Sequence, residues 1–163
     1  MSVFQDWKYN KGNLKAQLVL AMFRLAQLAN RHIIIALVLC IYLGFYHVVV
    51  EWILGIELPR KLKAGKGLVI YHGQALVLNQ GVVLGEHCIL RNSTTIGHKK
   101  TADGGFSACP VIGNRVDIGA NVVIIGDISI GDNAIIGAGA VVVKSIPANC
   151  VVAGNPAKII KQF

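Results

Sequence analysis

Residues 112–146 read IGNRVDIGANVVIIGDISIGDNAIIGAGAVVVKSI, and this stretch decides the fold. An aliphatic residue returns every six positions, and a second small or aliphatic residue follows four positions after each. The same spacing is found upstream, and the aliphatic positions of the two blocks are Leu78, Leu84, Leu90, Ile96, Ile112, Ile118, Ile124, Ile130, Ile136 and Val142. A helix has a period near 3.6 and a strand a period of about 2, so neither accounts for six. The hexapeptide repeat predicts a parallel β-helix, in which three repeats complete one triangular coil.

The repeat is interrupted between Gly97 and Val111. Residues 98–110 (HKKTADGGFSACP) are rich in glycine, lysine and polar side chains, and they predict a loop ejected from the solenoid. Long ordered loops on a rigid scaffold often carry function. The alternative is a passive, variable surface loop.

The N-terminal part has a different pattern. Asn13 is a plausible helix cap, and Leu14, Leu18, Met22, Leu25 and Ala29 follow it at helical spacing. We therefore expect a helical segment over residues 1–58 and a β-helix domain over residues 59–163. Because a solenoid needs its ends covered, the helices could cap one end or join subunits.

Residues 33–50 form an apolar stretch interrupted only by His47, which is long enough to be considered as a membrane span. Glu51 and two glycines break or follow it, and basic residues flank both sides, so no orientation across a bilayer is specified. Two readings stay open: a buried or interface helix, and a helix associated with a membrane surface.

Composition excludes several classes of protein. The chain has 163 residues, a formal net charge of +8, 54% hydrophobic and 15% charged residues, which excludes a disordered chain. Four cysteines without a CxxC pair argue against a disulfide scaffold, a zinc ribbon or a thioredoxin-like protein. No nucleic-acid recognition motif accompanies the positive charge. Without a signal-peptide pattern, the expected compartment is the cytoplasm.

His72 departs from the repeat. Run back from Leu78, the six-residue register reaches His72, an imidazole where an inward-facing aliphatic side chain is expected. A residue that violates local consistency is a functional candidate. The alternative is that the register has not yet begun, or that His72 lies on the surface at the end of the solenoid.

Several stretches resemble one enzyme family. Residues 55–58 (GIEL), 65–79 (GKGLVIYHGQALVLN), 95–98 (TIGH), 109–113 (CPVIG) and 153–158 (AGNPAK) are similar to parts of the serine acetyltransferases and their polysaccharide-modifying relatives. The short length, the apolar helix before a glycine-acidic run and the CPVIG element favour the colanic acid biosynthesis acetyltransferase group. The resemblance implies a left-handed β-helix, acetyl-CoA as co-substrate without a metal, and a homotrimer with each site between two subunits.

The resemblance also implies catalytic roles. His72 matches the catalytic base, and Glu57, fifteen residues earlier, falls where serine acetyltransferases carry the aspartate paired with that histidine. A positioned imidazole can accept the proton of a sugar hydroxyl as it attacks a thioester, and a carboxylate on the other ring nitrogen fixes the tautomer. A backbone N–H from a glycine-rich corner could stabilise the oxyanion. Glu57 could instead be a plain surface carboxylate.

Four further residues match positions that hold the cofactor in the family. Small residues at Gly97, Ala120 and Ala138 would let the pantetheine arm approach the corners, and Lys158 would lie near the phosphorylated nucleotide. For the two alanines, simple corner geometry is an equally good explanation.

The departures from the family concern the acceptor. Serine acetyltransferases have an acidic residue before the catalytic histidine and an Arg-His pair before the proline that follows the loop. Tyr71, Ala108 and Cys109 occupy these positions here, so an amino-acid zwitterion would find no charged partners. Tyr71 and Cys109 are thus candidate substrate-binding residues for a glycan or lipid-linked sugar of a surface or capsular polysaccharide. No basic partner supports Cys109 as an acetylated nucleophile, and Cys88 is simplest as a core residue.

Three alternatives were weighed. A serine O-acetyltransferase would need acceptor contacts that Tyr71 and Cys109 do not offer. A γ-type carbonic anhydrase would need two histidines five residues apart, whereas His72, His87 and His98 are 15 and 11 apart. A non-enzymatic β-helix anchored at a membrane by its apolar N-terminus would leave His72 and the AGNPAK tail unexplained. The sequence therefore favours an O-acetyltransferase that works in the cytoplasm, in contact with the inner membrane face if the apolar stretch touches lipid.

Overall fold

The computed structural model describes residues 2–163 and shows a mainly β protein with three parallel sheets. Sheet A comprises β1 (Ile56–Glu57), β4 (Leu76–Leu78), β7 (Thr95–Gly97), β10 (Val123–Ile125) and β13 (Val141–Val142). Sheet B comprises β2 (Lys63–Ala64), β5 (Val83–Leu84), β8 (Val111–Ile112) and β11 (Ser129–Ile130). Sheet C comprises β3 (Val69–Tyr71), β6 (Ile89–Arg91), β9 (Asp117–Ile118), β12 (Ile135–Ile136), β14 (Cys150–Ala153) and the antiparallel β15 (Lys158–Gln162).

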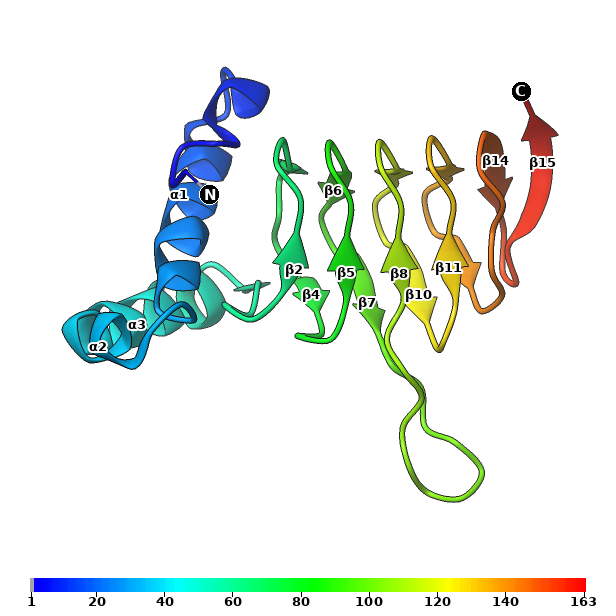
Figure 1. The fold of residues 1–163 in the computed structure, drawn as a ribbon. Helices are drawn as coiled ribbons and strands as arrows, with labels where there is room; N and C mark the ends of the chain where they lie inside the picture. Colours follow the sequence, from blue (N-terminus) through cyan, green and yellow to red (C-terminus); the bar gives the residue numbers. More distant parts are fainter. Residues whose placement is uncertain (1) are drawn as a thin grey trace.

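The chain visits the sheets in the order A, B, C, so each coil of the solenoid has three sides. In Figure 1 the chain advances from left to right, while β2, β5, β8 and β11 on the near side run upward and the chain then turns away at the top. This rotation is left-handed. The predicted left-handed parallel β-helix is confirmed.

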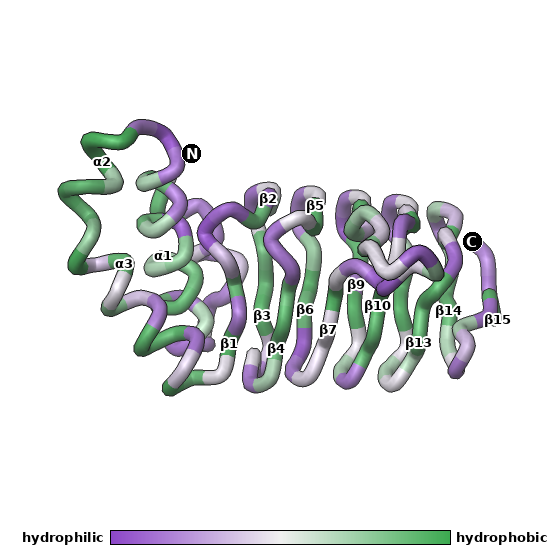
Figure 2. The backbone as a smooth tube through the Cα atoms, turned by 90° about the horizontal axis from the view of Figure 1, so that it is seen from below, coloured by the Kyte–Doolittle hydropathy of each residue, from purple (hydrophilic) through white to green (hydrophobic). Residues whose placement is uncertain are grey.

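The aliphatic positions of the hexapeptides fill the interior. Ile118 and Ile124 are fully buried, and so are the residues four positions after an aliphatic, such as Val122 and Ala134. Figure 2 shows the alternation of apolar and polar residues along the coils. Burying these side chains away from water is the main contribution to the stability of the solenoid.

A regular coil is 18 residues long, and two places depart from this length. Val77 pairs with Thr95 and Val123 with Val141, both 18 residues on. Tyr71 pairs with Arg91, 20 residues on, so the corner between β3 and β4 holds two extra residues. The coil that contains residues 98–110 spaces its partners by 28, which confirms the predicted loop; it projects from the corner between sheets A and B (Figure 1).

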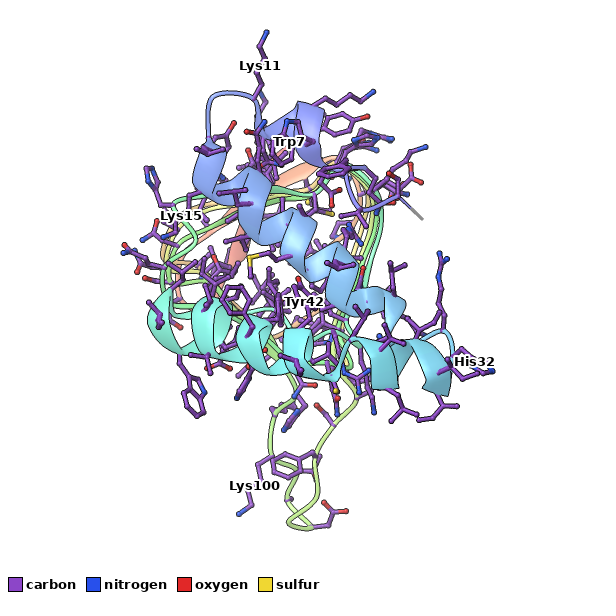
Figure 3. The ribbon with its side chains drawn as sticks, turned by 90° about the vertical axis from the view of Figure 1, so that its left-hand side faces the viewer. Trp7, Lys11, Lys15, His32, Tyr42 and Lys100 are labelled. Carbon is purple, nitrogen blue, oxygen red and sulfur yellow. The ribbon has the colours of Figure 1, made fainter. Side chains whose placement is uncertain are left out.

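Helices cover the N-terminal end of the solenoid (Figure 3). They are a 3₁₀ turn η1 (Trp7–Asn10), α1 (Leu14–Leu28), α2 (Ile33–Val38), α3 (Cys40–Tyr46) and a π-helical segment η2 (His47–Ile53). Asn13 caps α1 as predicted, because its side chain accepts a hydrogen bond from Ala16 N at 3.1 Å.

The spacing identified helix α1 but not its buried face. Leu14 and Leu18 are 63% and 49% exposed, whereas Val19, Leu20 and Phe23 are buried against the solenoid. The spacing fits both faces of this apolar helix, and contact with the first coil selects between them.

Polar side chains from the helices bond to the backbone of the first coil. Asn10 Nδ2 donates to Leu68 O at 2.9 Å, and its Oδ1 accepts from Ile70 N at 3.1 Å. The other side chains that bond to the backbone of this coil are Asp6, Asn13, Arg24, Gln27, Asn30 and Tyr46. The fully buried Arg24 also forms an ion pair with Asp6 at 2.7 Å.

The apolar stretch of residues 33–50 is divided among α2, α3 and the start of η2. Within the described chain, residues 2–163, no helix is both long enough and apolar enough to span a bilayer. The stretch is not a buried helix either, because Leu37 and Ile41 are 66% and 86% exposed.

Candidate active site between two edges of the solenoid

His72 lies in the enlarged corner between β3 and β4. Its φ is +66°, a left-handed conformation that is uncommon outside glycine, and its side chain is exposed. The expectation that His72 replaces an inward aliphatic is wrong: Ile70 faces the interior and pairs with Leu90. The two extra residues shift the six-residue register, so counting back from Leu78 reaches the corner instead of the core. This places the imidazole outside the solenoid, where a substrate can approach it.

An open cavity of about 430–570 Å³ is a common size for a small-molecule site, and a cavity of about 570 Å³ adjoins His72. Lys15 Nζ donates to His72 O at 3.4 Å, and Tyr71, 44% exposed, carries the Arg91 guanidinium 5.6 Å from its ring centroid. The lining residues are Lys11, Gly12, Asn13, Leu14, Lys15, Tyr71, His72 and Gln74. Two lysines and no carboxylate make this cavity positively charged.

Ala120 and Ala138 lie on the same edge of the solenoid as His72, between sheets C and A. Successive corners on this edge are joined by backbone hydrogen bonds: Ser93 N donates to Gln74 O at 2.8 Å, Asn121 N to Asn92 O at 3.1 Å, and Gly139 N to Ala120 O at 2.8 Å. The exposed Lys158 pairs with Ala153 at the far end of the same edge. We call this the histidine edge.

Glu57, Gly97 and Cys109 lie on the other side of sheet A, toward its corner with sheet B. Glu57 and Gly97 line a second cavity of about 390 Å³ together with Asn79 and His98. Asn79 Nδ2 is 3.0 Å from His98 Nδ1, and the Cys109 thiol donates to Asn79 Oδ1 at 3.3 Å, so Asn79 bonds to both ends of the loop. We call this the loop edge.

Sequence reasoning missed Asn79 and His98. The available signal was their position: His98 follows Gly97 as the first residue of the interruption, and Asn79 ends β4, which pairs with β7 directly before the loop. The Phe106 ring contacts the His98 ring edge-on at 4.3 Å between centroids, which fixes the loop against this edge.

A single chain does not join the proposed catalytic pair. Across residues 2–163, no hydrogen bond or ion pair connects Glu57 with His72, which belong to the loop edge and the histidine edge. The predicted site residues thus fall into two groups: His72, Tyr71, Ala120, Ala138 and Lys158 in one, and Glu57, Gly97 and Cys109 in the other.

The remaining chemistry-bearing side chains lie outside both groups. No three His, Cys, Asp or Glu side chains gather as a metal-binding cluster in the described part of the chain. Cys88 is fully buried, and burial raises the pKa of its thiol, as expected for an unreactive core residue.

Comparison with known proteins places this geometry. The model of the bacterial transferase hexapeptide family (six repeats) matches residues 109–144. The colanic acid biosynthesis acetyltransferase WcaB of Escherichia coli K12 is 34% identical over 161 residues, covering 96% of this chain and 98% of WcaB. The chain belongs to the hexapeptide-repeat acetyltransferases.

Solved structures agree with this assignment. Soybean serine acetyltransferase, determined as the apoenzyme, superimposes with a TM-score of 0.80 at 27% identity, covering 97% of this chain and 67% of the soybean chain. Serine acetyltransferase of Brucella abortus, determined with coenzyme A, has a TM-score of 0.74 at 28% identity, covering 93% of this acetyltransferase and 58% of the Brucella chain. The acetyltransferase described here therefore shares its solenoid with longer enzymes.

Proposed function

We propose that this acetyltransferase moves the acetyl group of acetyl-CoA to a sugar hydroxyl of a surface or capsular polysaccharide or its precursor, with His72 as general base. The observation that carries the proposal is the β3–β4 corner. Two extra residues there present an exposed imidazole in a left-handed conformation beside an open cavity. Strained backbone of this kind is concentrated at functional sites.

The proposed reaction is a direct transfer. The imidazole of His72 accepts the hydroxyl proton as the sugar oxygen attacks the thioester carbonyl carbon, and a corner N–H stabilises the resulting oxyanion. The C–S bond then breaks, the acetyl ester remains on the sugar, and the imidazolium returns the proton to the leaving thiolate. A carboxylate on the other ring nitrogen, which we assign to Glu57, stabilises the imidazolium.

We infer a homotrimer whose sites form where the histidine edge of one subunit faces the loop edge of the next. A cyclic assembly joins two different surfaces of each subunit, so one chain can supply both halves of every site. This arrangement brings Glu57, Gly97 and Cys109 of one subunit to His72 and Tyr71 of its neighbour. The missing contact between Glu57 and His72 within the chain supports it.

We assign acetyl-CoA to the histidine edge. Ala120 and Ala138 lie in successive coils between the His72 corner and the tail, which suits an extended pantetheine arm. Lys158 at the far end would meet the phosphates of the nucleotide. The coenzyme A complex of the Brucella abortus relative supports acetyl-CoA as the co-substrate.

The acceptor cavity favours a sugar over serine. Serine carries an ammonium group, and the cavity beside His72 offers Lys11 and Lys15 but no carboxylate to pair with it. Tyr71 can stack on a sugar ring, and the two lysines suit an acidic sugar or a phosphate-linked precursor. The alternative, a serine O-acetyltransferase, is supported by the solved relatives. Acetyl-CoA use places the reaction on the cytoplasmic side.

Acetyl-CoA turnover, followed by thiol release with polysaccharide repeat units or serine as acceptor, tests the proposal. His72→Ala should reduce kcat by about 10²–10⁴-fold, the usual contribution of a general base. His87→Ala is the matched control, because His87 is also a corner histidine with φ +59° but belongs to a coil corner on the opposite side. Equal turnover by wild type and His72→Ala would refute the base, and turnover with serine alone would refute the sugar acceptor.

Mixed assemblies test the shared site. His72→Ala and Glu57→Ala damage different edges, so trimers refolded from both variants should contain some sites with neither change. Activity of the mixture above that of either variant alone supports a site between subunits. Activity no higher than that of the variants would place both residues in one subunit's site.

A further inference from the structure

The segment from α2 to η2 presents an apolar face to solvent. Its exposed side chains recur at intervals of three or four residues and lie on one side of the helices, while Tyr46 and Val50 on the other side are buried. The exposed residues, each 56–86% accessible, are Ile33, Ile34, Leu37, Val38, Ile41, Phe45, Trp52 and Ile53. Figure 2 shows α2 and α3 as a strongly apolar segment beside the solenoid, and monomeric proteins rarely expose a contiguous surface of this kind. We call it the apolar face.

A cationic cavity adjoins the start of this face. It measures about 430 Å³ and lies between the end of α1 and the first coil. Four cations, Arg31, Arg60, Lys61 and Lys63, line it without any carboxylate, and Arg31 is two residues before Ile33. Asn30 Nδ2 donates to Arg60 O at 2.6 Å, which holds that part of the rim.

The acidic residue near the other end does not offset this charge. Glu51 forms an ion pair with His47 one helical turn away. Trp52, 71% exposed, closes the apolar face at that end, and tryptophan is enriched where protein meets the headgroup region of a bilayer. Apolar side chains next to clustered cations are the pattern of helices that lie in the plane of an anionic membrane.

We propose that the apolar face and the cationic cavity together dock this acetyltransferase on an anionic lipid bilayer. The helices lie in the interface, since none of them within residues 2–163 can span the membrane. A second copy of the chain fits less well, because pairing two apolar faces by two-fold symmetry would bring the four cations of each copy together. The proposal does not depend on the acceptor, and it places the enzyme where lipid-linked substrates are found.

Vesicle co-sedimentation of the full chain, without acetyl-CoA, tests the proposal. The wild type should bind vesicles of phosphatidylcholine mixed with phosphatidylglycerol, bind pure phosphatidylcholine far more weakly, and release as salt is raised. Leu37→Ser with Ile41→Ser should lower the partition coefficient by about tenfold or more. Arg31→Gln with Lys61→Gln should lower it by about fivefold for each cation removed.

The controls match these changes elsewhere on the surface. Ile160→Ser with Phe163→Ser removes two exposed apolar side chains at the opposite end, and Lys144→Gln with Lys161→Gln removes the same charge there. Both should bind vesicles like the wild type. Far-ultraviolet circular dichroism shows that each variant is folded.

Several outcomes would overturn the proposal. The first is a wild type that does not bind anionic vesicles, and the second is control variants that lose as much binding as the test variants. Sedimentation velocity supplies a third: if Leu37→Ser with Ile41→Ser changes the oligomeric state while the wild type ignores vesicles, the face is an interface between copies. Because no turnover is measured, a failed acceptor assignment leaves this test intact.

Discussion

The two ends of the β-helix are closed in different ways. At the N-terminal end, helices place buried polar side chains against the first coil, with Arg24 and Asn10 bonded to its backbone. At the C-terminal end, β15 pairs antiparallel with β14, and all five of its residues are exposed. One end is sealed by buried side chains and the other by a solvent-exposed strand.

The difference follows from what each end lacks. An inner coil satisfies its N–H and C=O groups with the coils on both sides, whereas an end coil leaves one set unpaired. A strand such as β15 replaces a missing coil with the same backbone groups. Helices cannot do so, since their own backbone bonds are internal, and side chains must substitute for the missing coil. Substitutions at the N-terminal end should therefore be the more damaging ones.

The largest effect on stability is expected at Arg24. Arg24→Ala removes the buried partner of Asp6 and leaves Ala64 O and Gly65 O without their donor. Breaking a buried pair in this way costs about 3–5 kcal/mol. Urea unfolding measures it, with Lys161→Ala on β15 as the control that should change by less than about 0.5 kcal/mol. Similar losses at both sites would remove the distinction between the ends.

A smaller loss is expected at Asn10. Asn10→Ala leaves Leu68 O and Ile70 N buried without partners, and an unsatisfied buried group costs about 1–3 kcal/mol. Gln162→Ala, in the exposed strand β15, is the control and should be neutral. Unfolding midpoints that fall equally for the two variants would contradict the side-chain seal.

Lys158 separates function from stability at the C-terminal end. Lys158→Ala should leave the unfolding midpoint unchanged, because the side chain is exposed and surface charges contribute little. If it meets the nucleotide phosphates, the KM for acetyl-CoA should rise by about fivefold at low salt with kcat unchanged. Steady-state kinetics at low and high salt measure both, and an unchanged KM would remove Lys158 from the proposed site.

The smallest effect concerns a polar contact on the outside of the solenoid. Hydrogen bonds to Asp132, first from Asn114 N and then from the Asn114 side chain, lower the pKa of its carboxyl below the usual 3.8. A lowered pKa adds stability above the unfolded value, which is lost as pH falls from about 4 toward the folded value. Asp132→Asn should therefore show a shallower decline in urea midpoint below about pH 4. An identical decline in both proteins would show that this contact contributes nothing.

The repeating part of the fold could be predicted because its signal is local. Ile118 and Ile124 face the interior as the six-residue period requires, and the interruption after Gly97 is a projecting loop. A period reports on neighbours one coil away, and those neighbours are a fixed number of residues apart. The same reasoning failed at His72, where two extra residues in one corner shifted the register.

The seal at the N-terminal end could not be predicted. Asp6 bonds to Leu68 N, 62 residues on, and no periodic pattern connects these positions. The candidate site was likewise found only in part. His72 and Glu57 came from the resemblance, but their placement on two edges depends on the turns of the solenoid, and Asn79 became a candidate only through its bonds to His98 and Cys109.

The constant coil makes the solenoid a ruler. From the β3 corner that carries His72 to the β14 turn that precedes Lys158, sheet C advances through four strand spacings. At about 4.8 Å each, they separate the two corners by about 19 Å. Inserting or deleting one 18-residue coil would change this length by a single fixed step without altering either end. The number of coils thus sets how long a ligand must be to reach from the histidine to the tail.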